Sequence, residues 1–71
     1  MINIFITGGT GSTGSYILDQ FRDDPKYHLF ILTRNKKKVT PSNNFTIVEG
    51  DMLNLDTFKK YFKNIDYLIH V

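Results

Sequence analysis

Glycine residues are concentrated in one short stretch near the start of the chain, and their spacing suits phosphate binding. The run T-G-G-T-G-S-T-G at residues 7–14 follows directly on the apolar residues 2–6. Glycines at positions 8, 11 and 14 leave a backbone without side chains where a strand is expected to turn into a helix. Backbone N–H groups and the positive end of the helix dipole can then meet an anion. The run therefore predicts a nucleotide-binding turn.

A second reading of the same glycines, as a P-loop, is disfavoured by one position. Gly9 and Gly14 have the P-loop spacing, but Ser15 stands where that motif requires lysine. A glycine triplet on its own is weak evidence for dinucleotide binding. Here a predicted strand precedes it and a helical stripe follows it within one βαβ unit, which makes the motif specific.

Four apolar runs predict strands, at residues 2–7, 28–33, 45–49 and 67–71, and the first two are typical of strands buried on both faces. Between the first two, apolar positions recur at helical spacing over residues 14–21, and this helix should stop near 23–25, before Pro25. Residues 35–44 are expected to form a loop with one helical turn at 36–39. A second helix is predicted over residues 55–63, with Asn54 as its N-cap.

This order of elements predicts an α/β fold with a parallel sheet of four strands. Right-handed crossovers give the strand order 3-2-1-4 with a helix on each face. Ligands of such sheets bind in the crevice where the strand order reverses, here between strands one and four. The sequence ends inside strand four, so we expect residues 1–71 to be the N-terminal part of a larger domain, or an oligomer partner to cover that edge.

Composition narrows the possible functions. A net charge of +2 is too small to suggest a nucleic-acid-binding protein, although Arg34 and Lys36–Lys38 form a local basic cluster. The chain has no cysteine for disulfides or thiolate metal sites, and no spaced histidine or carboxylate cluster for a metal. It also has no signal-peptide pattern and no apolar run long enough for a bilayer, so a cytoplasmic location without membrane contact is expected.

Four motifs together resemble the short-chain dehydrogenase/reductase superfamily, in its extended or atypical branches. These branches include NAD(P)-dependent epimerases, dehydratases and NmrA-like proteins. The run at 7–14 matches the family's T-G-x-x-G-x-x-G, and residues 32–34 resemble its L-x-R ending of strand two. Residues 49–51 resemble its x-G-D turn, and Ile69-His70 its ending of strand four. The resemblance covers the whole chain and implies a partial Rossmann fold.

The resemblance also implies which residues bind the cofactor. Gly8, Gly11 and Gly14 would form the pyrophosphate turn, together with Thr10, Ser12 and Thr13, the last two offering amides at the helix start. Asp51 would accept a hydrogen bond from the adenine amino group, and Met52 would lie against the ring. His70 is as readily a structural as a functional residue.

The residues after strand two favour NADP over NAD. An NAD site generally places Asp or Glu about 20 residues after the glycines to bind the ribose 2′-hydroxyl. This chain has Thr33-Arg34-Asn35 at that point. A guanidinium such as that of Arg34 can hold a 2′-phosphate with two hydrogen bonds. The predicted cofactor is therefore NADP, with NAD less favoured.

Catalytic residues are not predicted within these 71 positions. The family's catalytic pair is a tyrosine followed by a lysine four residues later, and none of the four tyrosines has that lysine. We therefore expect the cofactor-binding half of an epimerase, dehydratase or reductase-type oxidoreductase. The alternatives are a non-catalytic, NADP-sensing regulatory module of the NmrA-like kind, or a truncated product without function.

Overall fold

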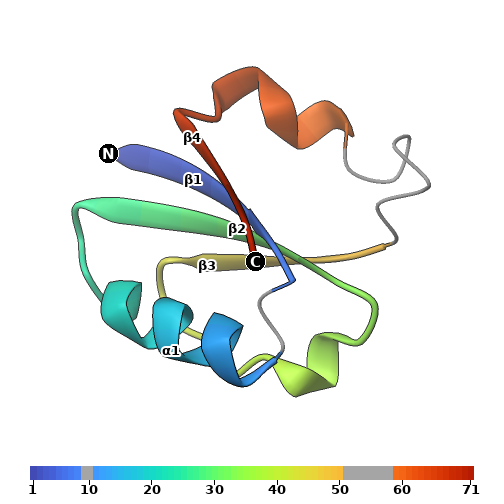
Figure 1. The fold of residues 1–71 in the computed structure, drawn as a ribbon. Helices are drawn as coiled ribbons and strands as arrows, with labels where there is room; N and C mark the ends of the chain where they lie inside the picture. The colour runs from blue at the N-terminus through green and yellow to red at the C-terminus, as the bar shows by residue number, and fades with distance from the viewer. Residues whose placement is uncertain (9–10, 51–58) are drawn as a thin grey trace.

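A single four-stranded sheet organises the chain (Figure 1). The computed structural model describes residues 1–8, 11–50 and 59–71. In chain order the elements are β1 (Ile2–Thr7), the helix α1 (Ser12–Phe21), β2 (Tyr27–Thr33), the 3-10 helix η1 (Lys36–Lys38), β3 (Phe45–Glu49), the 3-10 helix η3 (Lys59–Asn64) and β4 (Tyr67–His70).

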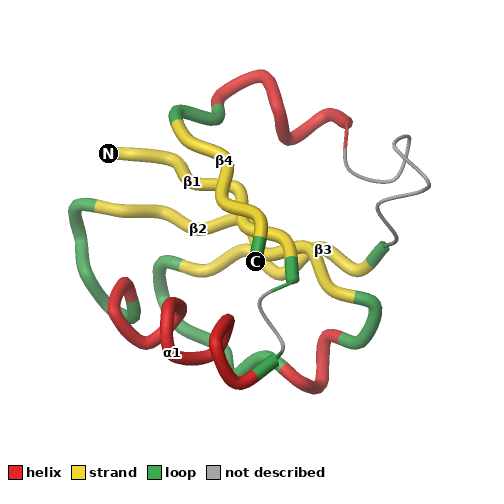
Figure 2. The backbone as a smooth tube through the Cα atoms, in the orientation of Figure 1, coloured by secondary structure: helices red, strands yellow, loops and turns green. Residues whose placement is uncertain are grey.

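The sheet has the predicted order and direction. Its strands run in the order β3-β2-β1-β4, and every neighbouring pair is parallel. β1 therefore lies inside the sheet, between β2 and β4 (Figure 2). Because all four strands point the same way, their carboxyl ends meet along one edge, where the chain leaves β1 for the glycine run. The α/β class and the 3-2-1-4 order are confirmed.

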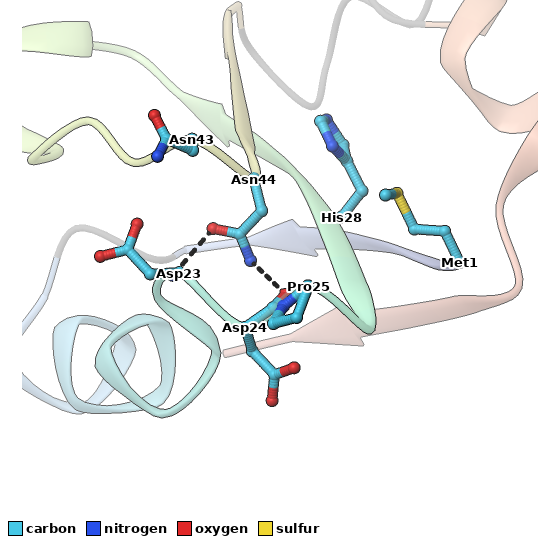
Figure 3. A pocket seen from close by; sticks show the side chains of 7 residues that line it. All are labelled: Met1, Asp23, Asp24, Pro25, His28, Asn43 and Asn44. Carbon is cyan, nitrogen blue, oxygen red and sulfur yellow. Dashed lines mark hydrogen bonds between the residues drawn. The ribbon is translucent and has the colours of Figure 1, made fainter.

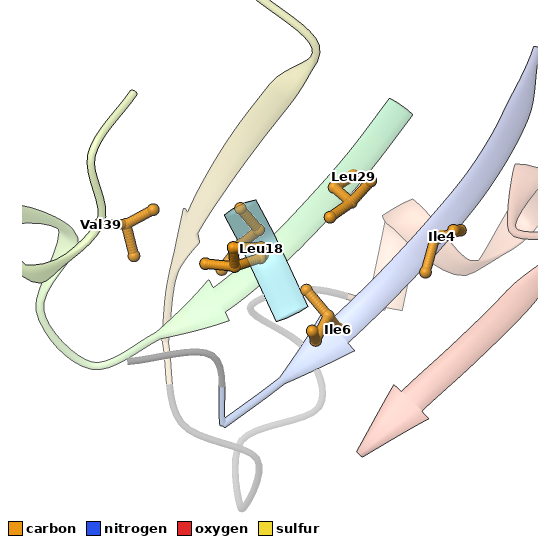
Figure 4. Packing of buried hydrophobic residues seen from close by; sticks show 6 residues of the cluster. Ile4, Ile6, Leu18, Leu29 and Val39 are labelled. Atoms are coloured by element: carbon orange, nitrogen blue, oxygen red, sulfur yellow. The ribbon is translucent and has the colours of Figure 1, made fainter. Parts of the chain in front are cut away.

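One face of the sheet packs against α1. Side chains at alternate positions of β1 and β2 form this cluster with Leu18 of α1 and Val39, the residue after η1 (Figure 4). The strand members are Ile4, Ile6, Leu29 and Ile31. Gly14 is buried within α1, and Ile17 and Phe21 pack against the same cluster. The predicted helical stripe is thus the buried face, although the helix begins at Ser12, two residues before the predicted start.

The opposite face is covered differently from the prediction. Phe5, Leu32 and Val48 form its buried cluster, and Ile65, just after η3, packs against them. η3 and α1 lie on opposite sides of the sheet (Figure 1). The predicted second helix is corrected over residues 59–63, where the backbone is a 3-10 helix; its first half and the Asn54 N-cap lie outside the described residues. In a 3-10 helix the hydrogen bonds join residues three apart in the chain, one fewer than in an α-helix.

The turn from α1 into β2 is organised by Asn44, the residue before β3. Its side chain is 7% exposed, and its Oδ1 accepts a hydrogen bond of 3.0 Å from the backbone N of Asp23. Asp23 has a positive φ of 59°, which is uncommon outside glycine. The Asn44 amide nitrogen lies 2.7–3.1 Å from three carbonyl oxygens, those of Phe21, Asp24 and Tyr27. One buried side chain therefore fixes the helix end, the turn and the entry to β2.

None of the helices in the described part of the chain is long and apolar enough to cross a membrane.

Candidate functional site

The first glycine of the run, Gly8, occupies a position that only glycine fits. Gly8 has a φ of +74°, in the left-handed region that other residues rarely adopt. A Cβ placed there would lie 2.6 Å from the backbone oxygen of Val71, the residue after β4. Gly8 therefore serves the packing of the chain itself, because it lets the end of β4 approach the exit of β1.

Gly11 differs from Gly8 in both respects. It is the N-cap of α1, with ordinary extended dihedrals of −79° and 176°, and its carbonyl accepts the hydrogen bond of Ser15 at 2.8 Å. Among the residues that the structure describes, a Cβ on Gly11 would meet no atom within 4 Å. Neither its backbone nor its described neighbours require glycine. No described residue occupies the space beside the Cβ position of Gly11.

The exits of β1 and β4 are joined by side chains as well as backbone. Thr7 Oγ1 lies 2.6 Å from His70 Nδ1, and Val71 N donates to the Thr7 carbonyl oxygen at 3.1 Å. Thr7 is 2% exposed, whereas His70 is exposed. The two strands are therefore tied together at the crevice where the strand order reverses. His28, the other histidine, lies at the amino end of β2, so the two histidines are at opposite ends of the sheet.

The basic cluster lies at this same carboxyl edge. Arg34 directly follows β2, and the three lysines of η1 come next, all of them exposed. Asn35 caps η1, since its Oδ1 accepts from the backbone N of Lys37 at 3.0 Å. Glu49, at the end of β3, accepts from the backbone N of Lys36 at 3.3 Å. These contacts hold the basic segment against the ends of β2 and β3.

Some predicted site residues cannot be placed. Thr10, Asp51 and Met52 lie outside the described residues, as do the side-chain surroundings of Ser12. Gly50 N donates to the Thr33 carbonyl oxygen at 2.9 Å, so the chain leading to Asp51 leaves the sheet at the carboxyl edge. The order of elements brings the other predicted residues to that edge: Gly8, Gly11, Thr13 and Gly14 at the start of α1, and Arg34 after β2.

A pocket of about 310 Å³ lies at the other end of the sheet (Figure 3). Its lining comes from the residues that precede β1, β2 and β3 and from the amino end of β2: Met1, Asp23, Asp24, Pro25, His28, Asn43 and Asn44. The carboxylates of Asp23 and Asp24 point in different directions, away from His28 (Figure 3). The side chains do not converge on one point, and this pocket is separate from the predicted site. Within residues 1–8, 11–50 and 59–71 there is no group of three or more potential metal ligands.

Two contacts at the site were not predicted from the sequence. They are the Thr7–His70 hydrogen bond and the approach of Val71 to Gly8. The strand order 3-2-1-4 places the last residues of strands one and four side by side, so a polar residue at each position was the available signal.

Comparisons with known proteins agree with this geometry. The model of the NAD dependent epimerase/dehydratase family matches residues 4–71. No match was found among curated protein sequences. Among solved structures, a Rossmann-fold NAD(P)-binding family protein from Shigella flexneri is 23% identical with a TM-score of 0.90, over 100% of this chain and 37% of its own. The oxidoreductase ylbE from Lactococcus lactis is 27% identical with a TM-score of 0.81, over 99% of this chain and 32% of its own.

This chain therefore spans about a third of the length of the solved structures that it matches. The likeness to the Shigella protein concerns the fold, and the family match covers nearly every residue. Three observations point to the same family: the parallel sheet in the order β3-β2-β1-β4, the glycine run at the exit of β1, and this match. The chain belongs to the NAD-dependent epimerase/dehydratase family, whose cofactor is a nicotinamide dinucleotide.

Proposed function

We propose that residues 1–71 form the N-terminal, dinucleotide-binding part of an NAD(P)-dependent epimerase, dehydratase or reductase. The observation that supports this proposal most is that no described residue occupies the space beside Gly11 at the start of α1. A diphosphate that approached the first turn of α1 would occupy that space and accept hydrogen bonds from its backbone N–H groups. In this proposal Gly8 supports the turn from behind, and Thr10, Ser12, Thr13 and Gly14 complete it.

The chemistry of the nicotinamide ring belongs to the cofactor, which supplies hydride transfer when bound. The residues of this chain bind and orient the adenosine and diphosphate end. Asp51 and Met52 are proposed to contact the adenine. The catalytic tyrosine and lysine of the family would come from chain beyond residue 71, within the same larger domain. A cytoplasmic location is part of this proposal, in keeping with the family match.

Gly11→Ala tests the binding site directly. Because alanine fits the Gly11 backbone without a described clash, we expect the free energy of unfolding to fall by only about 1 kcal/mol, the cost of replacing a glycine by alanine at a helix N-cap. The methyl group would obstruct the diphosphate, so affinity for NADPH and NADH should fall at least about tenfold, a loss of about 1.4 kcal/mol. Titration calorimetry measures the affinity, and urea unfolding without nucleotide measures the stability.

Gly8→Ala is the matched control. It forces a left-handed backbone on alanine and a clash with Val71, so it should lower the free energy of unfolding by about 1–3 kcal/mol. The proposed site would be wrong if Gly11→Ala bound both dinucleotides as tightly as the unaltered protein.

We further propose that the protein prefers NADP. The support is the position of Arg34 at the exit of β2, followed by the exposed lysines of η1, where an NAD site would have a carboxylate. A guanidinium–phosphate contact contributes about 1.5–3 kcal/mol, and a hydroxyl offers it nothing comparable.

Arg34→Asp should therefore lower the ratio of NADP to NAD affinity by about ten- to a hundredfold. Lys26→Asp is the control, because Lys26 is exposed just before β2 and the substitution makes the same charge change at the opposite edge of the sheet. The preference for NADP is refuted if the ratio is equal in the two variants.

A further inference from the structure

Two histidine–threonine hydrogen bonds occur on one face of the sheet, one at each end. His70 Nδ1 lies 2.6 Å from Thr7 Oγ1 at the carboxyl edge. His28 Nε2 lies 2.7 Å from Thr46 Oγ1 at the amino edge. His28 is level with Asn3 in the β1–β2 register, four residues before Thr7, so the pairs are separated by roughly 13 Å along the strands.

The Thr7–His70 pair, unlike the His28–Thr46 pair, directly adjoins the glycine run. Thr7 is the last residue of β1, and the next residue is Gly8, where the backbone turns with a φ of +74°. The Thr7 carbonyl oxygen also accepts the backbone N–H of Val71. Both the side chain and the carbonyl of Thr7 are thus held by the end of β4, immediately before the glycine run.

The histidine is the exposed partner of this bond, and the threonine is the buried one. The hydroxyl of Thr7 is enclosed, and its orientation is fixed by the ring nitrogen that it meets. A buried hydroxyl without that partner would cost free energy and loosen the strand exit. The other end of the β1–β4 pair is fixed separately, since Asn3 N donates to Asp66 Oδ2 and Asp66 N donates to the Asn3 carbonyl oxygen, each at 2.8 Å.

We propose that His70 is a positioning residue for dinucleotide binding, acting through Thr7 to hold the point at which β1 enters the glycine run. This inference rests on the proposed function of that run. His70 need not touch the cofactor in this role. It fixes the backbone from which the binding turn starts, and Thr7 transmits that constraint.

The test removes the hydroxyl without changing side-chain shape. Thr7→Val should weaken binding of NADPH and NADH about five- to tenfold. Thr46→Val removes the equivalent hydroxyl at the amino edge, and it should leave both affinities within about twofold, as a loss below 0.5 kcal/mol does. His70→Asn places an amide near the position of Nδ1 and should retain near-normal affinity, whereas His70→Leu should lose affinity as Thr7→Val does. Titration with each dinucleotide gives these values.

Hydrogen exchange of the Val71 amide adds a readout that needs no nucleotide. Its bond to the Thr7 carbonyl should open more often in Thr7→Val, raising the exchange rate about fivefold, but not in Thr46→Val. An unaltered protein that bound neither dinucleotide would overturn the proposed function and this inference with it. A protein that bound normally, with equal affinities in Thr7→Val and Thr46→Val, would overturn this inference alone.

Discussion

Asn44 connects three segments of backbone with one buried amide. It meets carbonyl oxygens from the end of α1, from the following turn and from the start of β2. No local sequence motif marks this role, because the residues whose carbonyl oxygens accept from the Asn44 amide lie 17–23 positions earlier in the sequence. From the sequence, Asn44 was predicted only to be part of a loop. Its role depends on a tertiary arrangement that no short window of residues specifies.

Asn44→Ala should be among the more damaging single substitutions. It removes the hydrogen bonds of the buried Asn44 amide to the backbone of the turn, and each such bond contributes about 0.5–1.5 kcal/mol. We expect a total loss of about 2–4 kcal/mol in the free energy of unfolding. Urea denaturation followed by circular dichroism measures this loss. Asn43→Ala, at the exposed neighbouring position, is the control, and equal midpoints for the two variants would contradict the role given to Asn44.

The two glycines that the structure describes in most detail show how far a motif can be read. The sequence predicted that positions 8 and 11 belong to one turn, and both lie at the exit of β1. It did not predict that the two positions differ structurally. A side chain at position 8 would clash with Val71 after β4, whereas a Cβ at position 11 would meet no described residue. Spacing alone cannot separate these demands, because glycine satisfies both.

At the level of elements, the strands were the most predictable part of the fold. Strands buried on both faces need continuous apolar residues, and each of the four runs became a strand with bounds within about one residue of the prediction. α1 was predicted from apolar positions at helical spacing, and the same positions form its buried face in the structure. The turn at η1 was also predicted within the loop after β2.

The segment at 59–64 shows where this approach fails. An apolar stripe with spacings of three and four residues predicts which side of a helix is buried. The stripe does not distinguish a 3-10 helix, with hydrogen bonds between residues three apart, from an α-helix, with hydrogen bonds between residues four apart. Both helices bring positions with these spacings to the same side. The α-helical prediction over 59–63 was therefore wrong in type, although a helical segment is present on the expected side of the sheet.

At the level of the whole molecule, the β4 side of the sheet exposes several large apolar side chains of the described part of the chain. β4 is the last strand in the order, and Tyr67 and Leu68 are each 62% exposed. Val71 is 40% exposed beside them. The matched solved structures are about three times longer than this chain. We therefore propose that further chain of the same domain covers β4 in the complete protein.

A polypeptide limited to residues 1–71 should consequently self-associate through β4 as its concentration rises. Leu68→Lys places a charge on the exposed strand and should reduce association without altering the core, because Leu68 contributes little burial. Sedimentation velocity over a series of concentrations measures the effect. Lys63→Leu is a control for general surface hydrophobicity, since Lys63 is exposed in η3. Monomeric behaviour at every concentration would contradict this prediction.

The central place of β1 also has a consequence for how the protein folds. Thr7 of β1 pairs with His70 of β4, which lies 63 positions later in the sequence, whereas the residues of β2 that pair with β1 lie only about 25 positions later. Closing the longer loop costs more chain entropy, and during synthesis residues 67–70 leave the ribosome after β1, α1 and β2. We expect the β1-α1-β2 unit to nucleate and β4 to dock late. The crevice between β1 and β4 would thus be completed only when β4 docks, so newly made chains would gain the ability to hold a nucleotide at that step and not when β1, α1 and β2 first assemble.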